Sequence, residues 1–310
     1  MTRVGILGPG GVGGFLAAAL DRAGEQVIVV APEATAERIG RDGIEVESVR
    51  LGSFTARPQA AAALTEPVEV LLIATKAPSL APALERIRVQ PRLVVPLLNG
   101  LDHVRMLRER FGEAQVAAGT IRIESDRPDP GRVVQTSPFL RVELASDQPA
   151  TGPALRRLAD MLERAGVPTQ LGSSEAQVLW SKLLRLNALA CTTSATGRPI
   201  GFIRSDAKWR AALERVIAET AAVARAEGAE LDPAATLAEL DDAHAELGSS
   251  MQRDIAAGRR PELDAIPGAV LRAAERHGLS CPTVACLTVE IATRAGIPAP
   301  LEAKSQALVG

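Results

Sequence analysis

The sequence predicts an α/β domain with a mainly parallel sheet over residues 1–172 and an all-helical domain over residues 173–310. From Thr2 to about Gly172, short apolar runs alternate with helix-like segments, which is the pattern of a parallel α/β sheet. After Ser173 the chain changes to Ala-, Leu-, Glu- and Arg-rich runs with helical periodicity. A length of 310 residues also favours two domains, because single hydrophobic cores stop growing at about 250–300 residues.

Apolar runs predict the strands of the first domain, and we expect helices in several of the gaps between them. The predicted strands are Val4–Leu7, Val27–Val30, Val70–Ala74, Leu93–Leu97, Val116–Ile123, Val133–Thr136 and Leu140–Leu144. The segments Gly43–Val46 and Gly52–Ala56 predict a small hairpin ahead of the strand that begins at Val70.

The first strand runs into a glycine-rich turn and then into a helix. Residues 4 to 14 read VGILGPGGVGG, and a helical pattern, FLAAALDRAG, follows. Gly8, Gly10 and Gly13 suit a tight turn, a close approach of the backbone to a pyrophosphate, and close packing of the helix on the strand. The helix is expected to begin near Gly11 and to direct its N–H groups and positive dipole end at phosphates. We therefore predict a dinucleotide-binding Rossmann domain, with the cofactor held by Gly8, Pro9, Gly10, Gly11, Val12 and Gly13.

Helical periodicity in the second domain is interrupted by glycine and proline, which mark the helix boundaries. The predicted helices cover 174–195, 206–227, 233–246, 262–277 and 283–295. The Ala/Leu-rich character of these helices suits a helix-packed interface, so we expect a homodimer.

Composition excludes several classes of protein. The net charge is −2, there is no sustained Lys/Arg cluster, and aromatic residues make up 2%, so nucleic acid is not the expected partner. No apolar stretch approaches the roughly 20 residues that span a bilayer, and the N-terminus enters the first strand without a signal peptide, so a cytoplasmic location is expected. Neither disulfides nor a metal site is expected, because the three cysteines lack zinc-site spacing and the histidines are scattered along the sequence. The cysteines are expected to pack as small apolar groups between helices. These residues are Cys191, Cys281, Cys286, His103, His244 and His277.

Three polar positions could carry chemistry. Lys76 follows the apolar strand VLLIAT and Asn99-Gly100 follows LVVPLL, so both are expected at the carboxyl edge of the sheet. Lys76 and Asn99 are therefore expected to face the cofactor and to contribute to its binding. A solvated loop lysine and a simple turn are the alternatives. Lys182 lies in EAQVLWSKLLRLNALACTTSATG, where apolar neighbours would strip water from its ammonium and suit it to proton donation. The alternative is an exposed lysine on an amphipathic helix.

Five segments together resemble the ketopantoate reductase (2-dehydropantoate 2-reductase) family in order and approximate spacing. They are GILGPGGVG, LLIATKAPS, LLNGLDH, LWSKLLRLNALACTTSATG and GSSMQRDIAAGRRPELDAIPGAVLRAAERHG. The resemblance covers nearly the whole chain. It implies a Rossmann domain followed by a helical domain, and reduction of a small-molecule 2-oxo acid, most readily ketopantoate to pantoate in pantothenate biosynthesis, with NADP(H).

The resemblance also implies roles for individual residues. Lys182 matches the catalytic lysine, Asn99 an asparagine that hydrogen-bonds in the active site, and Glu262 an acidic substrate ligand. Ser250 matches a serine that contacts the substrate carboxylate, and Lys76 a lysine near the nicotinamide. These roles are chemically coherent, because hydride addition to a keto carbon creates an alkoxide that must be stabilised and protonated. Glu262 alone has an alternative interpretation: a glutamate just after Pro261 suits the first turn of a helix, where the helix dipole favours a negative charge.

The cofactor region departs from the family. An arginine usually follows the second strand and binds the 2′-phosphate of NADPH, but Pro32 and Glu33 stand here. A carboxylate suits the ribose diol of NAD(H), so both cofactors stay open, with Arg38 or Arg41 able to reach a phosphate. A polar residue that often follows the Lys76 equivalent is here the shorter Ser79.

The region after Lys182 departs as well. Relatives commonly carry an asparagine four residues later, whereas this chain has Leu186 there and Asn187 one position further. Either Asn187 has lost the substrate role, or a one-residue π-bulge restores its direction, and the bulge is our hypothesis. With that insertion, Cys191 replaces another substrate-facing asparagine, and a thiol is a poor substitute for an amide. A more apolar 2-oxo acid or a related ketone is therefore an alternative substrate.

Two other functions are alternatives for this sequence. A β-hydroxyacid dehydrogenase combines a similar glycine turn with a catalytic lysine, but the Ser249-Ser250-Met251 segment and Glu262 favour the ketopantoate reductase reading. A non-catalytic nucleotide-binding sensor would have no need of a general acid such as Lys182.

Overall fold

The structure is a computed structural model that describes residues 2–300. It contains two compact units. The first comprises the chain up to Leu98 together with His103–Val178, and the second comprises Asn99–Asp102 and the chain from Leu179 onward. The boundary predicted from the sequence lies between residues 172 and 173, with the whole of Asn99–Asp102 in the first domain.

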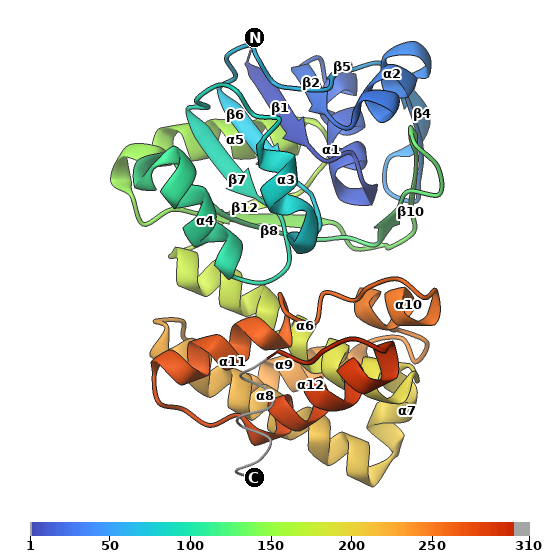
Figure 1. Cartoon of the computed structure of the whole chain (residues 1–310), viewed down its shortest axis with the longest axis vertical. Coiled ribbons are helices and arrows are strands. Elements are labelled where there is room, and N and C mark those ends of the chain that lie inside the picture. The colour runs from blue at the N-terminus through green and yellow to red at the C-terminus, as the bar shows by residue number, and fades with distance from the viewer. Residues whose placement is uncertain (1, 301–310) are drawn as a thin grey trace. The chain divides into compact units, whose positions relative to one another are not determined.

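A five-stranded parallel sheet forms the centre of the first unit (Figure 1). Its order is β5-β2-β1-β6-β7, and every neighbouring pair is parallel. In register, Val4 lies opposite both Val27 and Val70. The strands are β1 (Arg3–Leu7), β2 (Gln26–Val30), β5 (Gln59–Ala61), β6 (Val70–Ile73) and β7 (Leu93–Pro96). The predicted parallel α/β architecture is confirmed.

Two smaller sheets complete the strands of this unit. One has the order β4-β3-β10-β9 and the other β12-β11-β8. The antiparallel pairing of β3 with β4 confirms the predicted hairpin, with Glu45 opposite Thr55. The strands are β3 (Ile44–Ser48), β4 (Gly52–Ala56), β8 (Ala118–Arg122), β9 (Ser125–Asp126), β10 (Arg132–Gln135), β11 (Arg141–Ala145) and β12 (Thr169–Leu171).

Helices of the first unit pack apolar faces onto the strands. Helix α1 begins at Gly11, as predicted, and buries Phe15, Leu16 and Leu20 completely in the core. Burial of these large side chains is what holds the glycine turn in front of the sheet. The helices are α1 (Gly11–Arg22), α2 (Glu33–Asp42), α3 (Leu80–Leu84), α4 (Asp102–Phe111) and α5 (Gly152–Arg164), with 3₁₀ turns η1 (Ala77–Ser79), η2 (Glu113–Gln115) and η3 (Pro149–Thr151).

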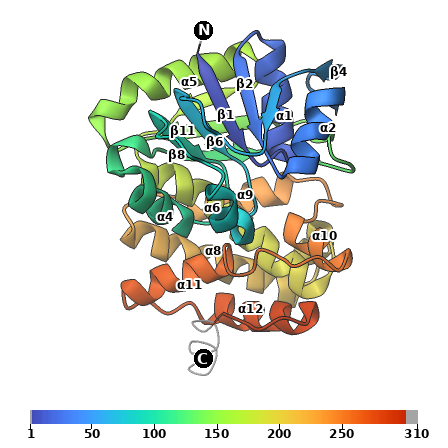
Figure 2. The same cartoon turned by 45° about the horizontal axis from the view of Figure 1, so that its top comes forward.

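The described residues of the second unit form a bundle of helices, in which α8, α11 and α12 pack on one another (Figures 1 and 2). Side chains of Asp206, Asp232 and Ser249 cap the N-termini of α8, α9 and α10. The helices are α6 (Glu175–Thr196), α7 (Ile200–Ser205), α8 (Ala207–Ala226), α9 (Pro233–Asp242), α10 (Ser250–Ala256), α11 (Pro267–Arg276) and α12 (Pro282–Ala295).

Several predictions for this unit are corrected. The helix predicted over 262–277 begins at Pro267, because a proline lacks an N–H and suits the first turn of a helix. Glu262 therefore lies in an irregular segment ahead of α11 and not in its first turn. Helix α9 ends at Asp242, and the short helices α7 and α10 were not predicted.

Helix α6 is α-helical from Glu175 to Thr196, so the hypothesis of a π-bulge after Lys182 is wrong. The Asn187 amide donates to the hydroxyl of Thr220 on α8 over 3.0 Å, so it has a buried partner without an inserted residue.

The three cysteines are free thiols, with Cys191 and Cys281 buried and Cys286 exposed. The expectation of helix packing is therefore wrong for Cys286, which helical periodicity directs away from the buried face of α12. Within residues 2–300, no cluster of His, Cys, Asp or Glu could hold a metal ion. No helix in the same part of the chain has the length and apolarity needed to traverse a bilayer.

Candidate active site

The glycine turn is built by hydrogen bonds between its own backbone groups and those of β2. Gly8 has a φ of +91°, a conformation that favours glycine. Its N–H donates to the carbonyl of Val30 over 3.0 Å, and its carbonyl accepts from the N–H of Gly10 over 2.9 Å. A Cβ at Gly13 would lie 2.2 Å from that same carbonyl oxygen. Gly8 and Gly13 are thus required by the turn itself.

Gly11 is required by a neighbouring strand. A Cβ there would lie 2.2 Å from the carbonyl oxygen of Ser125 on β9. The Ser125 hydroxyl in turn donates to the carbonyl of Gly11 over 2.9 Å. The start of α1 is therefore held between the parallel sheet and β9. Ser125 was missed by the sequence analysis, because a two-residue strand leaves no periodic signal.

Gly10 differs from the other glycines of the turn. A Cβ at Gly10 would meet nothing within 4 Å, and its φ of −73° is open to any residue. Neither packing nor backbone conformation explains a glycine there, whereas close approach of a ligand does. Helix α1 also has no side-chain cap and no acidic residue in its first turn, so its N-terminus is suited to an anion.

An orphaned hydroxyl lies beside this turn. The Oγ1 of Thr75 is buried without a hydrogen-bond partner, and the Cγ2 of Thr75 lies 2.7 Å from the position a Gly8 Cβ would take. A buried hydroxyl without a partner is costly unless a ligand supplies one. Together with the open space at Gly10, it indicates that these residues fit a dinucleotide. Thr75 directly precedes Lys76, at the strand end that the sequence analysis already considered.

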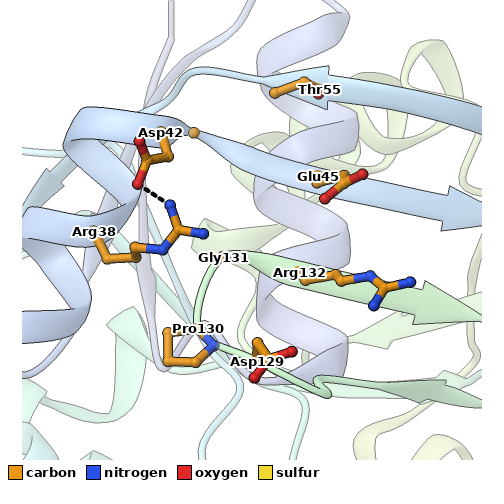
Figure 3. Close-up of a pocket in the computed structure, with 9 residues that line it drawn as sticks. Arg38, Asp42, Glu45, Thr55, Asp129, Pro130, Gly131 and Arg132 are labelled. Atoms are coloured by element: carbon orange, nitrogen blue, oxygen red, sulfur yellow. Dashed lines mark ion pairs between the residues drawn. The ribbon is translucent and has the colours of Figure 1, made fainter.

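Residues that follow β2 bear on the choice of cofactor. Pro32 and Glu33 are exposed at the start of α2. Arg38 forms an ion pair with Asp42 one turn further along α2 (Figure 3), and the Arg41 guanidinium lies 3.0 Å from the same carboxylate. Both arginines considered for a phosphate are therefore engaged with Asp42.

A hollow of about 410 Å³ lies beside that ion pair in the first unit (Figure 3). Its lining residues come from α2, β3, β4, the loop ahead of β10 and the first residue of β10, and they carry both signs of charge. They are Arg38, Asp42, Gly43, Glu45, Thr55, Asp129, Pro130, Gly131 and Arg132. No residue of the glycine turn lines it, so it is distinct from the predicted cofactor turn.

The second unit brings two predicted site residues together. The side-chain Nδ2 of Asn99 donates to Oε2 of Glu262 over 3.0 Å. Glu262 is 8% exposed and Asn99 is half-buried. The carbonyl of Glu262 also accepts from the N–H of Ile266 over 3.1 Å, which fixes the segment ahead of α11.

The remaining predicted residues have separate environments. Lys182 is half-buried on α6, next to the buried side chains of Trp180 and Leu183. Ser250 is exposed at the first position of α10, and its neighbour Ser249 is the buried cap of that helix. Lys76 is exposed in the first unit, three residues beyond the last residue of β6.

Asn187 and Cys191 pair with each other in the interior of the helical unit. The Nδ2 of Asn187 donates to the hydroxyl of Thr220 on α8 over 3.0 Å, and the Cys191 thiol donates to Oδ1 of Asn187 over 3.3 Å. All three residues are completely buried. Burial, with a smaller contribution from the negative charge of Glu219, raises the pKa of the Cys191 thiol far above its usual range. With the bulge absent, loss of the substrate role is the alternative that stays open for Asn187.

Two family models match the two parts of the chain. The one described as ketopantoate reductase PanE/ApbA matches residues 4–146, and the one described as its C terminal matches residues 176–295. The chain belongs to the ketopantoate reductase family. Members of this family are NAD(P)H-dependent 2-oxo acid reductases, so this chain is an oxidoreductase of that type and takes a nicotinamide cofactor.

Individual ketopantoate reductases resemble it over nearly their full length. The 2-dehydropantoate 2-reductase of Mycobacterium tuberculosis (strain ATCC 25618 / H37Rv) is 33% identical over 289 residues, covering 91% of this chain and 94% of that protein. An uncharacterized oxidoreductase of Bacillus subtilis (strain 168) is 27% identical over 286 residues, covering 90% of this chain and 94% of the relative.

Solved structures share the fold. A D-mandelate dehydrogenase with NADH and anilino(oxo)acetate has a TM-score of 0.86 at 20% identity, covering 95% of this chain and 98% of that chain. The 2-dehydropantoate 2-reductase from Geobacter metallireducens GS-15 has a TM-score of 0.86 at 24% identity, covering 94% and 99%.

Proposed function

We propose that this enzyme reduces 2-dehydropantoate, the substrate that names its family, or a closely related 2-oxo acid, with Lys182 as the general acid. The hydrogen bond between Asn99 and Glu262 carries this proposal. It joins two predicted site residues that are 163 positions apart in the sequence, in the same unit that holds Lys182. The two residues were predicted from separate motifs, and their contact supports a shared site.

The residues divide the chemistry between them. A nicotinamide nucleotide held by the glycine turn would supply hydride for the keto carbon. The ammonium of Lys182 then donates a proton to the keto oxygen as negative charge develops on it. The Asn99 amide has a second N–H, besides the one donated to Glu262, with which to orient the substrate. The Glu262 carboxylate accepts a hydrogen bond from a substrate hydroxyl, and the Ser250 hydroxyl donates to the substrate carboxylate.

We propose NADH as the preferred cofactor. Glu33 stands about 20 residues beyond the last glycine of the turn, where an acidic side chain suits the ribose 2′-hydroxyl. A 2′-phosphate would be repelled by this carboxylate. Arg38 and Arg41, which could have offset that repulsion, pair with Asp42 instead.

A 2-oxo acid with an apolar side chain is a second candidate substrate, and the regularity of α6 favours it. Leu186 lies one turn beyond Lys182 on the same face of an uninterrupted α-helix, and it is half-buried. A 2-oxo acid presents a carboxylate and a side chain on either side of its keto carbon. Because a leucine cannot satisfy a carboxylate, the group beside Leu186 would be the substrate side chain.

The test is the initial rate of NADH and, separately, NADPH oxidation with ketopantoate and with 2-oxo acids bearing apolar side chains. Wild-type protein is compared with Lys182→Ala and Lys182→Arg. We expect kcat to fall by about 10²- to 10⁴-fold in Lys182→Ala, with an unchanged dissociation constant for the cofactor. Cofactor binding with no oxidation by any 2-oxo acid would overturn the proposal in favour of a non-catalytic sensor.

A further inference from the structure

Arg272 on α11 joins two segments of the second unit that are far apart in the sequence. Its Nη2 donates to Oδ2 of Asp102 over 2.7 Å and to the carbonyl of Asp264 over 2.8 Å. Its Nη1 donates to Oδ1 of Asp264 over 2.8 Å. One guanidinium group therefore binds both carboxylates and one backbone carbonyl.

Each partner of Arg272 lies close to a predicted site residue. Asp102 ends the four-residue segment that begins at Asn99, and Asp264 follows Glu262 by two positions. The two segments also meet through their backbones at Gly100. Gly100 has a φ of +88°, and a Cβ there would lie 2.1 Å from the carbonyl oxygen of Ala265. The segment Asn99–Asp102 thus contacts the segment that follows Glu262 at two places. Asn99 bonds Glu262 at one place, and the Arg272 guanidinium bridges Asp102 and Asp264 at the other.

We propose that Arg272 is a positioning residue, which holds the Asn99 segment against the Glu262 segment so that the two side chains stay in hydrogen-bonding register. This inference rests on the function proposed above, in which Asn99 and Glu262 act on the substrate together. Arg272 acts only through these residues and does not touch the reacting atoms.

Charge and geometry both require an arginine here. Partial burial alone would lower the pKa of Arg272, but the hydrogen bond and charge of Asp102, with those of Asp264, outweigh it, and the net pKa is raised. The group therefore stays a cation at all working pH values. A lysine would keep the charge, yet a single ammonium lacks the planar fork that reaches two carboxylates and a carbonyl at once.

The test compares Arg272→Lys and Arg272→Ala with Arg276→Ala. Arg276 lies one turn further along the same helix, and its Nη2 donates to Glu227 over 3.0 Å, away from both site segments. We measure kcat and KM for the 2-oxo acid, the cofactor dissociation constant from nucleotide fluorescence, and the melting temperature. Arg272→Lys guards against a folding defect, because it keeps the charge and most of the side-chain packing.

We expect kcat/KM for the 2-oxo acid to fall by about 10- to 100-fold in both Arg272 variants, as for a small displacement of catalytic groups. The cofactor dissociation constant and the activity of Arg276→Ala should stay within about twofold of wild type. In an Asn99→Ala background, Arg272→Lys should cause little further loss, since residues that act as one unit are not additive. Wild-type activity in Arg272→Lys, or an equal loss in Arg276→Ala, would overturn the inference.

A crystal structure of Arg272→Ala separates this inference from the proposed function. We expect the distance between Nδ2 of Asn99 and Oε2 of Glu262 to exceed hydrogen-bonding range there. Retention of the bond would overturn the positioning role whether or not the enzyme turns over ketopantoate. Absence of 2-oxo acid turnover in the wild type, with the bond lost in the variant, would overturn the proposed function and leave the positioning role supported.

Discussion

The side-chain amide of Asn187 on α6 donates to the hydroxyl of Thr220 on α8 over 3.0 Å, and both residues are completely buried. The Thr220 hydroxyl in turn donates a hydrogen bond to the carbonyl of Val216 over 2.7 Å. These two hydrogen bonds link α6 to α8 inside the helical unit.

Asn187→Ala should lower stability without changing substrate preference. It removes the donor to Thr220 and the acceptor for the Cys191 thiol inside a dry interior, so we expect a loss of about 1–3 kcal/mol in the free energy of unfolding. Urea unfolding curves and the ratio of kcat/KM values for ketopantoate and an apolar 2-oxo acid are the measurements. An unchanged unfolding midpoint together with an altered ratio would show that Asn187 reads the substrate after all.

Leu186→Asn should raise the ratio of kcat/KM for ketopantoate to kcat/KM for an apolar 2-oxo acid, because ketopantoate carries a hydroxyl. An amide one turn beyond Lys182 could bond a substrate hydroxyl, whereas the leucine side chain leaves that hydroxyl without a partner. We therefore expect the ratio to rise by about tenfold. Asn187→Ala is the control, because its altered side chain points to α8. Equal ratios in wild type and Leu186→Asn would mean that this face of α6 does not meet the substrate.

Gly10→Ala should weaken cofactor binding while the protein folds normally. The protein itself leaves room for a methyl group at Gly10, so the cost in stability should be below about 1 kcal/mol. A methyl group aimed at the pyrophosphate should raise the KM for the nicotinamide nucleotide by about tenfold or more.

Gly40→Ala is the matched control for Gly10→Ala. Gly40 lies within α2, and a Cβ there would also meet nothing within 4 Å, so alanine should raise the melting temperature slightly without changing the KM. A Gly10→Ala enzyme with wild-type KM for both nucleotides would place the pyrophosphate elsewhere.

The thiols should differ sharply in reactivity. Burial, and to a smaller extent the charge of Glu219, raises the pKa of Cys281 from its ordinary value of 9.0 to about 12. Iodoacetamide at pH 8 should therefore alkylate the exposed Cys286 and spare Cys281 and Cys191 in the folded protein. Peptide mass spectrometry reads the three sites separately, and protein unfolded in guanidinium should be labelled at all three.

The raised thiol pKa also predicts an alkaline loss of stability. An acid group with a higher pKa in the folded state stabilises the protein fully below its unfolded pKa, and this contribution is lost as the pH rises through the folded value. For Cys281 the window runs from pH 9 upward to about 12. The melting temperature of Cys281→Ala should fall less steeply than that of wild type between these pH values; parallel curves would contradict this.

Local sequence signals predicted the parts of the fold that local forces build. The run from Val4 into the glycine turn and α1 contains a strand, a turn and a helix start in consecutive residues, and the structure has all three there. The prolines were more ambiguous, since Pro261 and Pro267 both suit a first helical turn, and the helix begins at Pro267. Strands of two or three residues, such as β9 and β12, are too short for a hydrophobic period to appear.

Candidate site residues could be predicted where a motif implies their chemistry, but their hydrogen-bond partners could not be predicted where those partners are distant in the sequence. Lys182, Asn99 and Glu262 came from motifs, but no local pattern couples Arg272 to Asp102, which is 170 positions away. The direction of Asn187 likewise depends on Thr220, 33 positions further along the chain. In the regular helix α6, the side chain of Asn187 bonds Thr220 without a one-residue bulge.

The four residues Asn99–Asp102 belong to the helical unit although both flanking segments belong to the other. The polypeptide therefore crosses between the units three times. For protein engineers this sets a limit on modular exchange. A chimera that grafts residues 179–300 onto a foreign nucleotide-binding domain would leave Glu262 without its native Asn99, and Arg272 without Asp102. The transplantable piece is discontinuous, and a recombination scheme must carry the tetrapeptide along with the helices.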